Sequence, residues 1–305
     1  MTKEQLLKNL ELPLGLHDAV LDTDTYNEVD DQFALAYMLR SNDRIRTRAI
    51  YAAPFFNRRS DSPEDGMEKS YNEILKVLEL CGRTDLNDCV YKGSKNYLQD
   101  EKTPVESPAA RHLAALCKEY SPENPLYVVA IGAITNVASA ILMEPAVAEN
   151  CVVVWLGGHS HNWYDTKEFN MVQDIAAARV VFSCGVPVVQ FPCMGVVEPF
   201  SFSRPELEAW FIGKNPLADY LGKNVLSYMG EKNGPATATK TIWDVTAVAW
   251  LSCKSFSFDI RPTLLPKYDG TYDHENPGQP FVYVYHINKA KLAGDLVARI
   301  AEETE

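Results

Sequence analysis

The sequence predicts an α/β fold with a mostly parallel central sheet and helices on both faces. Short apolar runs that suit buried strands alternate along the chain with segments in which apolar residues recur at helical spacing. The clearest runs are 126–131 (LYVVAI) and 151–156 (CVVVWL), and a glycine follows each of them directly. Strands that are apolar throughout are typical of parallel sheets, because helices cover both faces of such sheets. No linker divides the chain, so we expect residues 1–305 to form a single domain.

Strand-like and helix-like segments follow one another from the N-terminus. Apolar or alternating runs predict strands at 19–21, 45–53, 89–91, 126–131, 151–156, 186–191 and 281–287. Helical spacing predicts helices near 33–40, at 66–80, 109–120, after 132–136, and at 175–184, 204–230, 241–251 and 289–300, the segment 204–230 being interrupted at Gly213 and Pro216. In the second of these, for example, Tyr71, Ile74 and Leu78 fall on one face. The stretch 230–240 (GEKNGPATATK) has the composition of an exposed, mobile loop.

The composition argues against several classes of function. The chain has 29 basic and 41 acidic residues and a net charge of −12, whereas binding to nucleic acids or anionic membranes favours a basic surface. The first residues lack the apolar core of a signal peptide, and no apolar run has the length of a membrane span. The seven cysteines never form a Cys-x-x-Cys pair, as expected for thiols in a reducing compartment. We therefore expect a cytoplasmic protein that binds neither nucleic acid nor membrane.

One short stretch gathers acidic side chains between a strand and a helix. Five acids occur within ten residues: Asp22, Asp24, Glu28, Asp30 and Asp31. This places them in a loop at the carboxyl end of a strand, where open α/β sheets bind ligands. Carboxylates this close repel one another, and some must be protonated unless a cation neutralises them. Oxygen ligands without Cys or His indicate a hard cation, Ca²⁺ or Mg²⁺.

Three known acidic patterns compete for this stretch. A calcium-binding EF-hand loop needs a glutamate at its twelfth position, where Phe33 or Leu35 stands here. A phosphatase of the haloacid-dehalogenase type uses Asp-x-Asp-x-Thr, but Tyr26 occupies the place of the threonine. The stretch resembles most the Asp-x-Asp…Asp-Asp loop of nucleoside hydrolases. Five residues, 25–29, separate the second and third aspartates here, whereas the common form of that family has three. On this stretch alone the assignment stays open.

The remaining strand ends repeat the nucleoside hydrolase pattern in the same order along the chain. The matching segments are 52–57 (AAPFFN), 130–136 (AIGAITN), 156–158 (LGG), 168–170 (EFN) and 243–244 (WD). One such match is weak evidence, but five in order, each at a predicted element boundary, are strong evidence. The chain is therefore identified as a divergent member of the nucleoside hydrolase family. The resemblance implies a Rossmann-like core and a homodimer or homotetramer.

The resemblance also implies a metal site and a general base. Asp24 and Asp31 would bind Ca²⁺ together with Asp244 and the backbone carbonyl of Thr135. Asp24 would in addition take a proton from the metal-bound water, since a metal lowers the pKa of water toward neutrality. Asp22 would support the loop from behind the ligands.

The substrate side of the site follows from the same matches. The resemblance implies that ribose is held by Asp30, Asn57, Leu156, Glu168 and Asn170. Anionic oxygens around the sugar would stabilise the oxocarbenium character that develops when an N-ribosidic bond breaks.

Trp243 departs from the family, in which a histidine often stands before the last metal-binding aspartate and is proposed to protonate the leaving base. An indole N–H cannot supply a proton at neutral pH. Two interpretations stay open. Trp243 either packs beside the site while His159 or His161 supplies the proton, or it stacks on the departing base. We favour stacking, which would make Trp243 a substrate-binding residue.

The sequence thus predicts a calcium-dependent N-ribosyl hydrolase that cleaves ribonucleosides into ribose and free base. The alternatives are a hydrolase of another ribosyl compound, a phosphatase of the haloacid-dehalogenase type, and a non-catalytic protein that binds a sugar or a metal.

Overall fold

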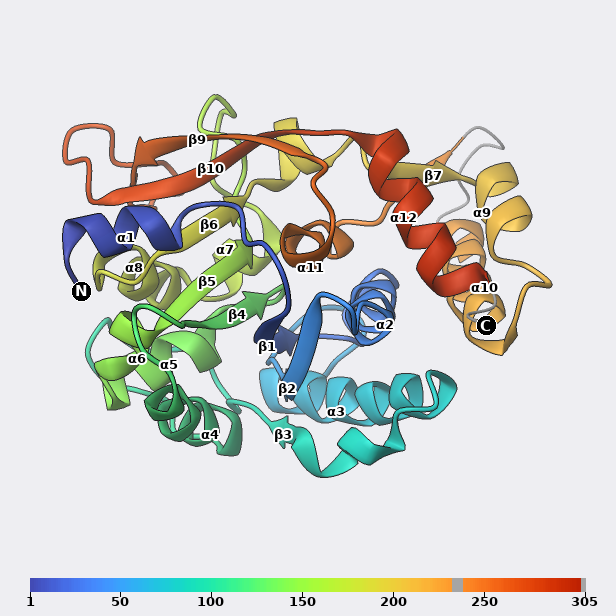
Figure 1. Ribbon diagram of the computed structural model, residues 1–305, viewed down its shortest axis with the longest axis horizontal. Coiled ribbons are helices and arrows are strands. Elements are labelled where there is room, and N and C mark those ends of the chain that lie inside the picture. Colours follow the sequence, from blue (N-terminus) through green and yellow to red (C-terminus); the bar gives the residue numbers. More distant parts are fainter. Residues whose placement is uncertain (232–237, 303–305) are drawn as a thin grey trace.

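Parallel strands form the centre of the molecule. The computed structural model describes residues 1–231 and 238–302, and within them the strands form an eight-stranded and a two-stranded sheet (Figure 1). The order of the large sheet is β3-β2-β1-β4-β5-β6-β10-β9, and only β9 runs antiparallel to its neighbour. Its strands are β1 (His17–Thr23), β2 (Ile45–Ala52), β3 (Val90–Lys92), β4 (Leu126–Ala130), β5 (Cys151–Leu156), β6 (Val188–Phe191), β9 (Phe256–Pro262) and β10 (Pro280–Ile287). The small sheet pairs β7 (Ser201–Ser203) with β8 (Thr239–Thr241).

Helices connect the strands and pack on the sheet. They are α1 (Lys3–Asn9), α2 (Asp31–Arg40), α3 (Pro63–Leu80), α4 (Pro108–Leu116), α5 (Thr135–Met143), α6 (Ala146–Asn150), α7 (Phe169–Gln173), α8 (Ile175–Ser183), α9 (Arg204–Trp210), α10 (Pro216–Glu231), α11 (Val245–Ser252) and α12 (Lys289–Ala301). Short 3₁₀ helices occupy Thr84–Cys89 and Cys117–Glu119, and an irregular π-helical turn occupies Cys193–Val197. In the part of the chain that the structure describes, no helix combines the length and the apolar composition of a membrane span.

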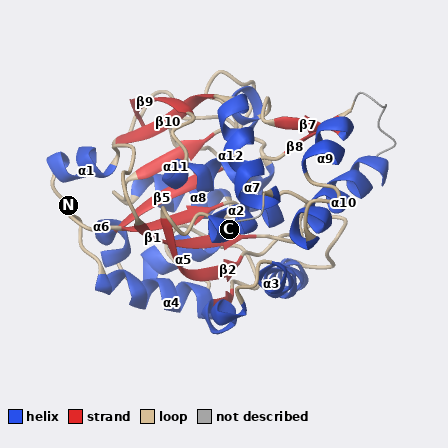
Figure 2. Cartoon of the chain, turned by 45° about the vertical axis from the view of Figure 1, so that its right-hand side comes forward, coloured by secondary structure: helices blue, strands red, loops and turns tan. Residues whose placement is uncertain are grey.

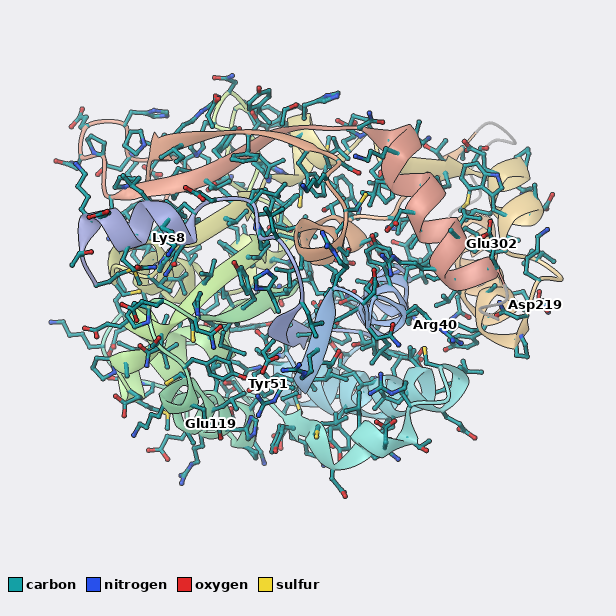
Figure 3. All side chains as sticks on the ribbon, in the orientation of Figure 1. Lys8, Arg40, Tyr51, Glu119, Asp219 and Glu302 are labelled. Atoms are coloured by element: carbon teal, nitrogen blue, oxygen red, sulfur yellow. The ribbon has the colours of Figure 1, made fainter. Side chains whose placement is uncertain are left out.

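Two hydrophobic cores lie on opposite faces of the large sheet, as Figure 2 shows by the helices on either side of the strands. Neighbouring residues of a strand point to opposite faces, so Leu21 joins one core and Val20 the other. Helices α2, α3, α11 and α12 cover the first face, and α4, α5 and α8 cover the second. Side chains fill the space between these layers (Figure 3). Tyr51, for example, is fully buried there, whereas Glu119 lies exposed at the surface of the molecule. The predicted fold class is confirmed.

The order of the strands places a crevice beside β1. The chain runs from β1 to β2 and β3 on one side, then returns to lay β4 on the other side of β1. Leu21 consequently pairs with Ile50 of β2 and with Val129 of β4, both in parallel register. At such a switch point the two connections leave in opposite directions, and the carboxyl ends of the strands border a ligand crevice. The acidic stretch leaves β1 at this point.

Two expectations about the C-terminal third are wrong. The predicted helix 241–251 begins only at Val245, because Thr241 belongs to β8 and Asp244 occupies the N-cap position of α11. The predicted exposed loop 230–240 includes 232–237, which lie outside the described residues. Its last residue, Lys240, is buried in β8, so the expectation of exposure fails there. Strand pairing and ion pairing fix this lysine, and neither is visible in a run of small polar residues.

The sheet core predicts a clear contrast between two leucines. Leu21 is fully buried in β1, whereas 66% of Leu14 is exposed. Leu21→Ala should lower the free energy of unfolding by about 2–5 kcal/mol, because it removes buried methylene groups and leaves a cavity. Leu14→Ala should change it by less than about 0.5 kcal/mol. Urea denaturation of both variants measures the difference, and equal losses would contradict the placement of Leu21.

Candidate active site

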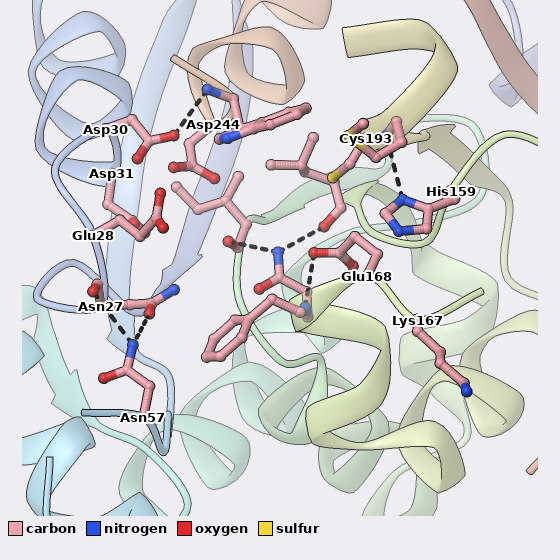
Figure 4. Close-up of a pocket in the computed structure, with 16 residues that line it drawn as sticks. Asn27, Glu28, Asp30, Asp31, Asn57, His159, Lys167, Glu168, Cys193 and Asp244 are labelled. Atoms are coloured by element: carbon pink, nitrogen blue, oxygen red, sulfur yellow. Dashed lines mark hydrogen bonds between the residues drawn. The ribbon is translucent and has the colours of Figure 1, made fainter. Parts of the chain in front are cut away.

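A pocket of about 260 Å³ lies at the carboxyl edge of the large sheet. Its walls come from the segments that follow β1, β2, β4, β5 and β6 and from the residues just before α11. The residues that line it are Asn27, Glu28, Asp30, Asp31, Asn57, Ile131, Leu156, His159, Lys167, Glu168, Phe169, Asn170, Cys193, Met194, Trp243 and Asp244. Figure 4 shows the acids Asp30, Asp31 and Asp244 on one side of this space and Glu168 and His159 on the other. The switch point therefore does carry a cavity with polar groups converging on it.

Three carboxylates meet at one wall of the pocket. Oxygen atoms of Asp30, Asp31 and Asp244 all lie within 4.8 Å of one another, and each residue is at least 95% buried. Burial and the negative charge of Asp30 raise the pKa of Asp31 to about 7. Burial and the neighbouring Asp31 raise the pKa of Asp244 well above its usual range. Without a cation, this cluster holds protons that a solvated aspartate would lose.

Asp24 lies directly behind this wall. It is 1% exposed, and neither of its carboxylate oxygens has a hydrogen-bond partner among residues 1–231 and 238–302. Burial and the charge of Asp31 raise its pKa well above the usual value. Gly132, in the turn after β4, approaches so closely that a Cβ there would lie 3.1 Å from the Asp24 carboxyl. Two orphaned anionic oxygens beside other carboxylates fit a hard cation with oxygen ligands.

Asp22 and Thr135, which were also predicted at this site, are held by other side chains of the protein. Asp22 is fully buried, and its Oδ1 accepts a hydrogen bond from Asn136 Nδ2 at 2.8 Å. Burial raises the pKa of Asp22 to about 7 despite that bond. Thr135 is the first residue of α5, and its hydroxyl donates to Asp174 Oδ2 at 2.7 Å. The Thr135 side chain is thus engaged with Asp174.

Glu168 and Asn170 form the opposite wall, around the N-terminus of α7. Glu168 caps this helix: its carboxylate accepts the backbone N–H groups of Asn170, Gly158 and Met171 at 2.8–3.0 Å. Burial nevertheless raises the Glu168 pKa to about 7. Gly158, at φ +75°, bends the chain after β5 so that its N–H faces the carboxylate.

The side-chain amide of Asn170 is oriented by the strand ends. Its nitrogen donates to the carbonyls of Ile131 and Leu156, at 3.1 and 3.0 Å. Both amide hydrogens are used in this way, which leaves the amide oxygen as an acceptor at the pocket wall. Leu156 contributes its side chain to the same wall and is 2% exposed.

Asn57 reaches the pocket from the loop after β2, but its side chain is engaged by the protein. Its nitrogen donates to Asn27 Oδ1 at 2.6 Å, and its oxygen accepts the backbone N–H of Arg59 at 2.8 Å. Figure 4 shows this amide pair at the edge of the pocket. Asn27 belongs to the lengthened segment 25–29 of the acidic loop, so this segment contacts a predicted sugar-binding residue.

Asp30 has partners on both oxygens. Its Oδ2 accepts the backbone N–H of Trp243 at 2.8 Å, and its Oδ1 lies 3.1 Å from the ammonium of Lys240. Burial opposes the charge of Lys240, but Asp30 and Glu28 outweigh this effect and raise its pKa. Sequence reasoning missed Lys240, because no motif distinguishes it within the polar run before Trp243.

The structure places Trp243 and His159 at the pocket but not His161. Trp243 is half-buried and lines the pocket, as stacking on a base requires. His159 also lines the pocket, and its Nδ1 accepts the backbone N–H of Met194 at 3.3 Å. His161 instead packs among Tyr272 and Tyr283, and burial lowers its pKa to about 4. Of the two histidines, only His159 lies where a leaving group could meet it.

Comparisons with known proteins identify the family of the chain. The sequence model of the family described as "Inosine-uridine preferring nucleoside hydrolase" matches residues 19–273. The probable uridine nucleosidase 2 of Arabidopsis thaliana is 25% identical over an alignment of 221 residues that covers 67% of this chain and 67% of the relative. Other curated relatives are matched over about half to two thirds of their length.

Two solved structures share the fold over nearly the whole chain. A plant nucleoside hydrolase, PpNRh1, superposes with a TM-score of 0.75 at 17% identity, covering 94% of this chain and 99% of the other. A purine-preferring ribonucleoside hydrolase from Gardnerella vaginalis gives a TM-score of 0.75 at 18% identity, covering 93% and 98%. Because the family model spans most of the sequence and the fold agrees with it, the chain belongs to the inosine-uridine preferring nucleoside hydrolase family.

Proposed function

We propose that the protein hydrolyses the N-glycosidic bond of ribonucleosides to ribose and free base, with Ca²⁺ held by Asp24, Asp31, Asp244 and the Thr135 carbonyl. The observation that carries the proposal is the buried carboxylate cluster, with two orphaned oxygens on Asp24, facing a pocket lined by hydrogen-bonding groups. When bound, Ca²⁺ supplies positive charge that lowers the pKa of water and orients sugar hydroxyls. Family membership supports the same chemistry.

The residues of this chain divide the remaining work. Asp24 takes the proton of the attacking water, since burial and the charge of Asp31 raise its pKa well above the usual aspartate value and so make it a stronger base. Asp30, Asn57, Glu168 and Asn170 hold the ribose hydroxyls, and Leu156 packs against the sugar. The anionic oxygens on both walls stabilise the positive charge that develops on the ribose ring. Asp22 orients the loop through its bond with Asn136.

The geometry argues against a phosphatase of the haloacid-dehalogenase type. In that chemistry the first aspartate of the Asp-x-Asp pair attacks phosphorus and must reach the substrate. Asp22 is fully buried, does not line the pocket and accepts a hydrogen bond from Asn136. Asp22 therefore does not face the cavity that a phosphate ester would have to enter.

The proposal predicts a requirement for both the metal and the 2′-hydroxyl. A release assay over inosine, adenosine, guanosine, uridine and cytidine should detect free base, and EDTA should abolish it until Ca²⁺ is restored. A site built to bind a hydroxyl discriminates strongly against its absence, so 2′-deoxyribonucleosides should be cleaved at least about 100-fold more slowly in kcat/KM. Asp30→Ala should reduce that ratio. Release of phosphate from phosphate esters, or equal kcat/KM for the two sugars, would contradict the proposal.

The place of Trp243 predicts a preference for purines. Stacking on an aromatic ring contributes about 1–3 kcal/mol per base, and the larger purine ring gains more from it. Trp243→Ala should therefore reduce turnover of inosine by about tenfold or more. It should affect p-nitrophenyl riboside much less, because the leaving group of that substrate needs no protonation. Trp210→Ala, at a half-buried tryptophan on α9 outside this pocket, serves as the control. If both substrates suffer equally, Trp243 is part of the scaffold and His159 becomes the candidate acid.

A further inference from the structure

Lys240 is buried beside the pocket but does not line it. Its side chain is 9% exposed, and its ammonium meets Asp30 Oδ1 at 3.1 Å, Glu28 Oε2 at 2.8 Å and the Thr241 carbonyl at 2.7 Å. A lysine ammonium has three N–H donors, and each has an acceptor here. Lys240 therefore has no donor left for a substrate, and its effect must pass through its partners.

The backbone of Lys240 is held in place by strand pairing. Lys240 pairs with Phe202 in the small sheet, and the next residue but one, Ile242, donates its N–H to the Phe200 carbonyl at 2.9 Å. A cation on a paired strand holds its anionic partners more precisely than one on a free loop would.

The expanded acidic loop completes the surroundings of this cation. Glu28 lies in the segment that separates Asp24 from Asp30, and its two oxygens contact Lys240 and the Tyr228 hydroxyl, the latter at 2.7 Å. Its backbone carbonyl accepts from Arg59 Nη1 at 2.8 Å. The longer loop thus brings a second carboxylate to Lys240, and both anions face one ammonium.

Asp30 is consequently fixed from two directions. Lys240 holds one oxygen and the Trp243 backbone N–H holds the other, while the residue remains at the pocket wall. Each oxygen has a second lone pair, so the carboxylate can still accept a hydroxyl from a substrate.

We propose that Lys240 is a positioning residue which, with Glu28 of the expanded loop, orients Asp30 to receive a ribose hydroxyl and so sets selectivity for ribose over 2-deoxyribose. This rests on the proposed function of Asp30 in sugar binding. Lys240 acts at a distance from the reacting atoms, so its loss should change sugar selectivity through Asp30 alone.

A double-mutant cycle tests this dependence. The wild type, Lys240→Met, Asp30→Ala and the double variant are assayed for kcat/KM on inosine and 2′-deoxyinosine. Lys240→Met should reduce the ribo-to-deoxy ratio by about tenfold or more when Asp30 is present. In the Asp30→Ala background the same change should alter the ratio by less than about twofold, because the group through which it acts is gone. An equal reduction in both backgrounds, or none in either, would overturn the proposal.

Two further variants protect the cycle against misfolding. Lys240→Met leaves the buried Asp30 and the partly exposed Glu28 without their cation, so Lys240→Met/Glu28→Gln removes charges of both signs and should show the same loss of selectivity. Lys223→Met is the matched control, because Lys223 forms an ion pair with Asp219 at 2.7 Å but is 63% exposed. It should leave the ratio unchanged.

A binding measurement separates this proposal from the proposed function. The quenching of tryptophan fluorescence by D-ribose and by 2-deoxy-D-ribose reports sugar affinity without turnover, since Trp243 lines the pocket. If the wild type releases no base from any nucleoside, the proposed function fails. The binding data still test the role of Lys240 in that case: the wild type should prefer D-ribose, and Lys240→Met should lose this preference. Equal sugar preference in the two proteins would refute that role.

Discussion

Mutual repulsion among buried carboxylates is the constraint on which the site depends. Asp24, Asp30, Asp31 and Asp244 lie behind or at one pocket wall, and each is almost entirely shielded from water. Such a group is stable only if its charge is neutralised by protons or cations. Lys240 lies at the edge of the cluster and supplies one positive charge, which Asp30 and Glu28 share. The oxygens of Asp24 are left without a protein partner among the described residues, and this is where we place the metal.

The strand order explains how acids from distant parts of the chain meet. β1 lies between β2 and β4, so the acidic loop and the turn after β4 leave the sheet side by side. Asp244, the residue just before α11, lies at the same edge of the sheet. Its neighbour Trp243 donates its backbone N–H to Asp30. This hydrogen bond links the acidic wall of the pocket to Trp243, the residue that we propose selects the base.

Local patterns predicted the fold and most of the pocket, because each pattern depends on residues close in sequence. Apolar runs located β4 and β5 to within a residue, and the strand-end motifs located Glu168, Asn170 and Asp244, all of which line the pocket. Lys240 escaped prediction because its burial comes from ion pairs with residues about 210 positions away. β9 was missed for a related reason: it is an edge strand with half-exposed residues, and only its pairing with β10 identifies it.

The central claim is that a cation, not a set of protons, neutralises the cluster at neutral pH, and thermal unfolding tests it directly. Burial raises the pKa of Asp22 and Asp31 to about 7, above their values in an unfolded chain, so protonated acids stabilise the metal-free fold at low pH. That stability is lost as pH rises through about 7. The EDTA-treated protein should therefore lose Tm between about pH 5 and pH 8, and Ca²⁺ should raise Tm more at the higher pH. Asp31→Asn should abolish this calcium effect, and Asp269→Asn, at an exposed acid, should leave it intact. A calcium-induced shift that is absent, or equal at both pH values, would contradict the account.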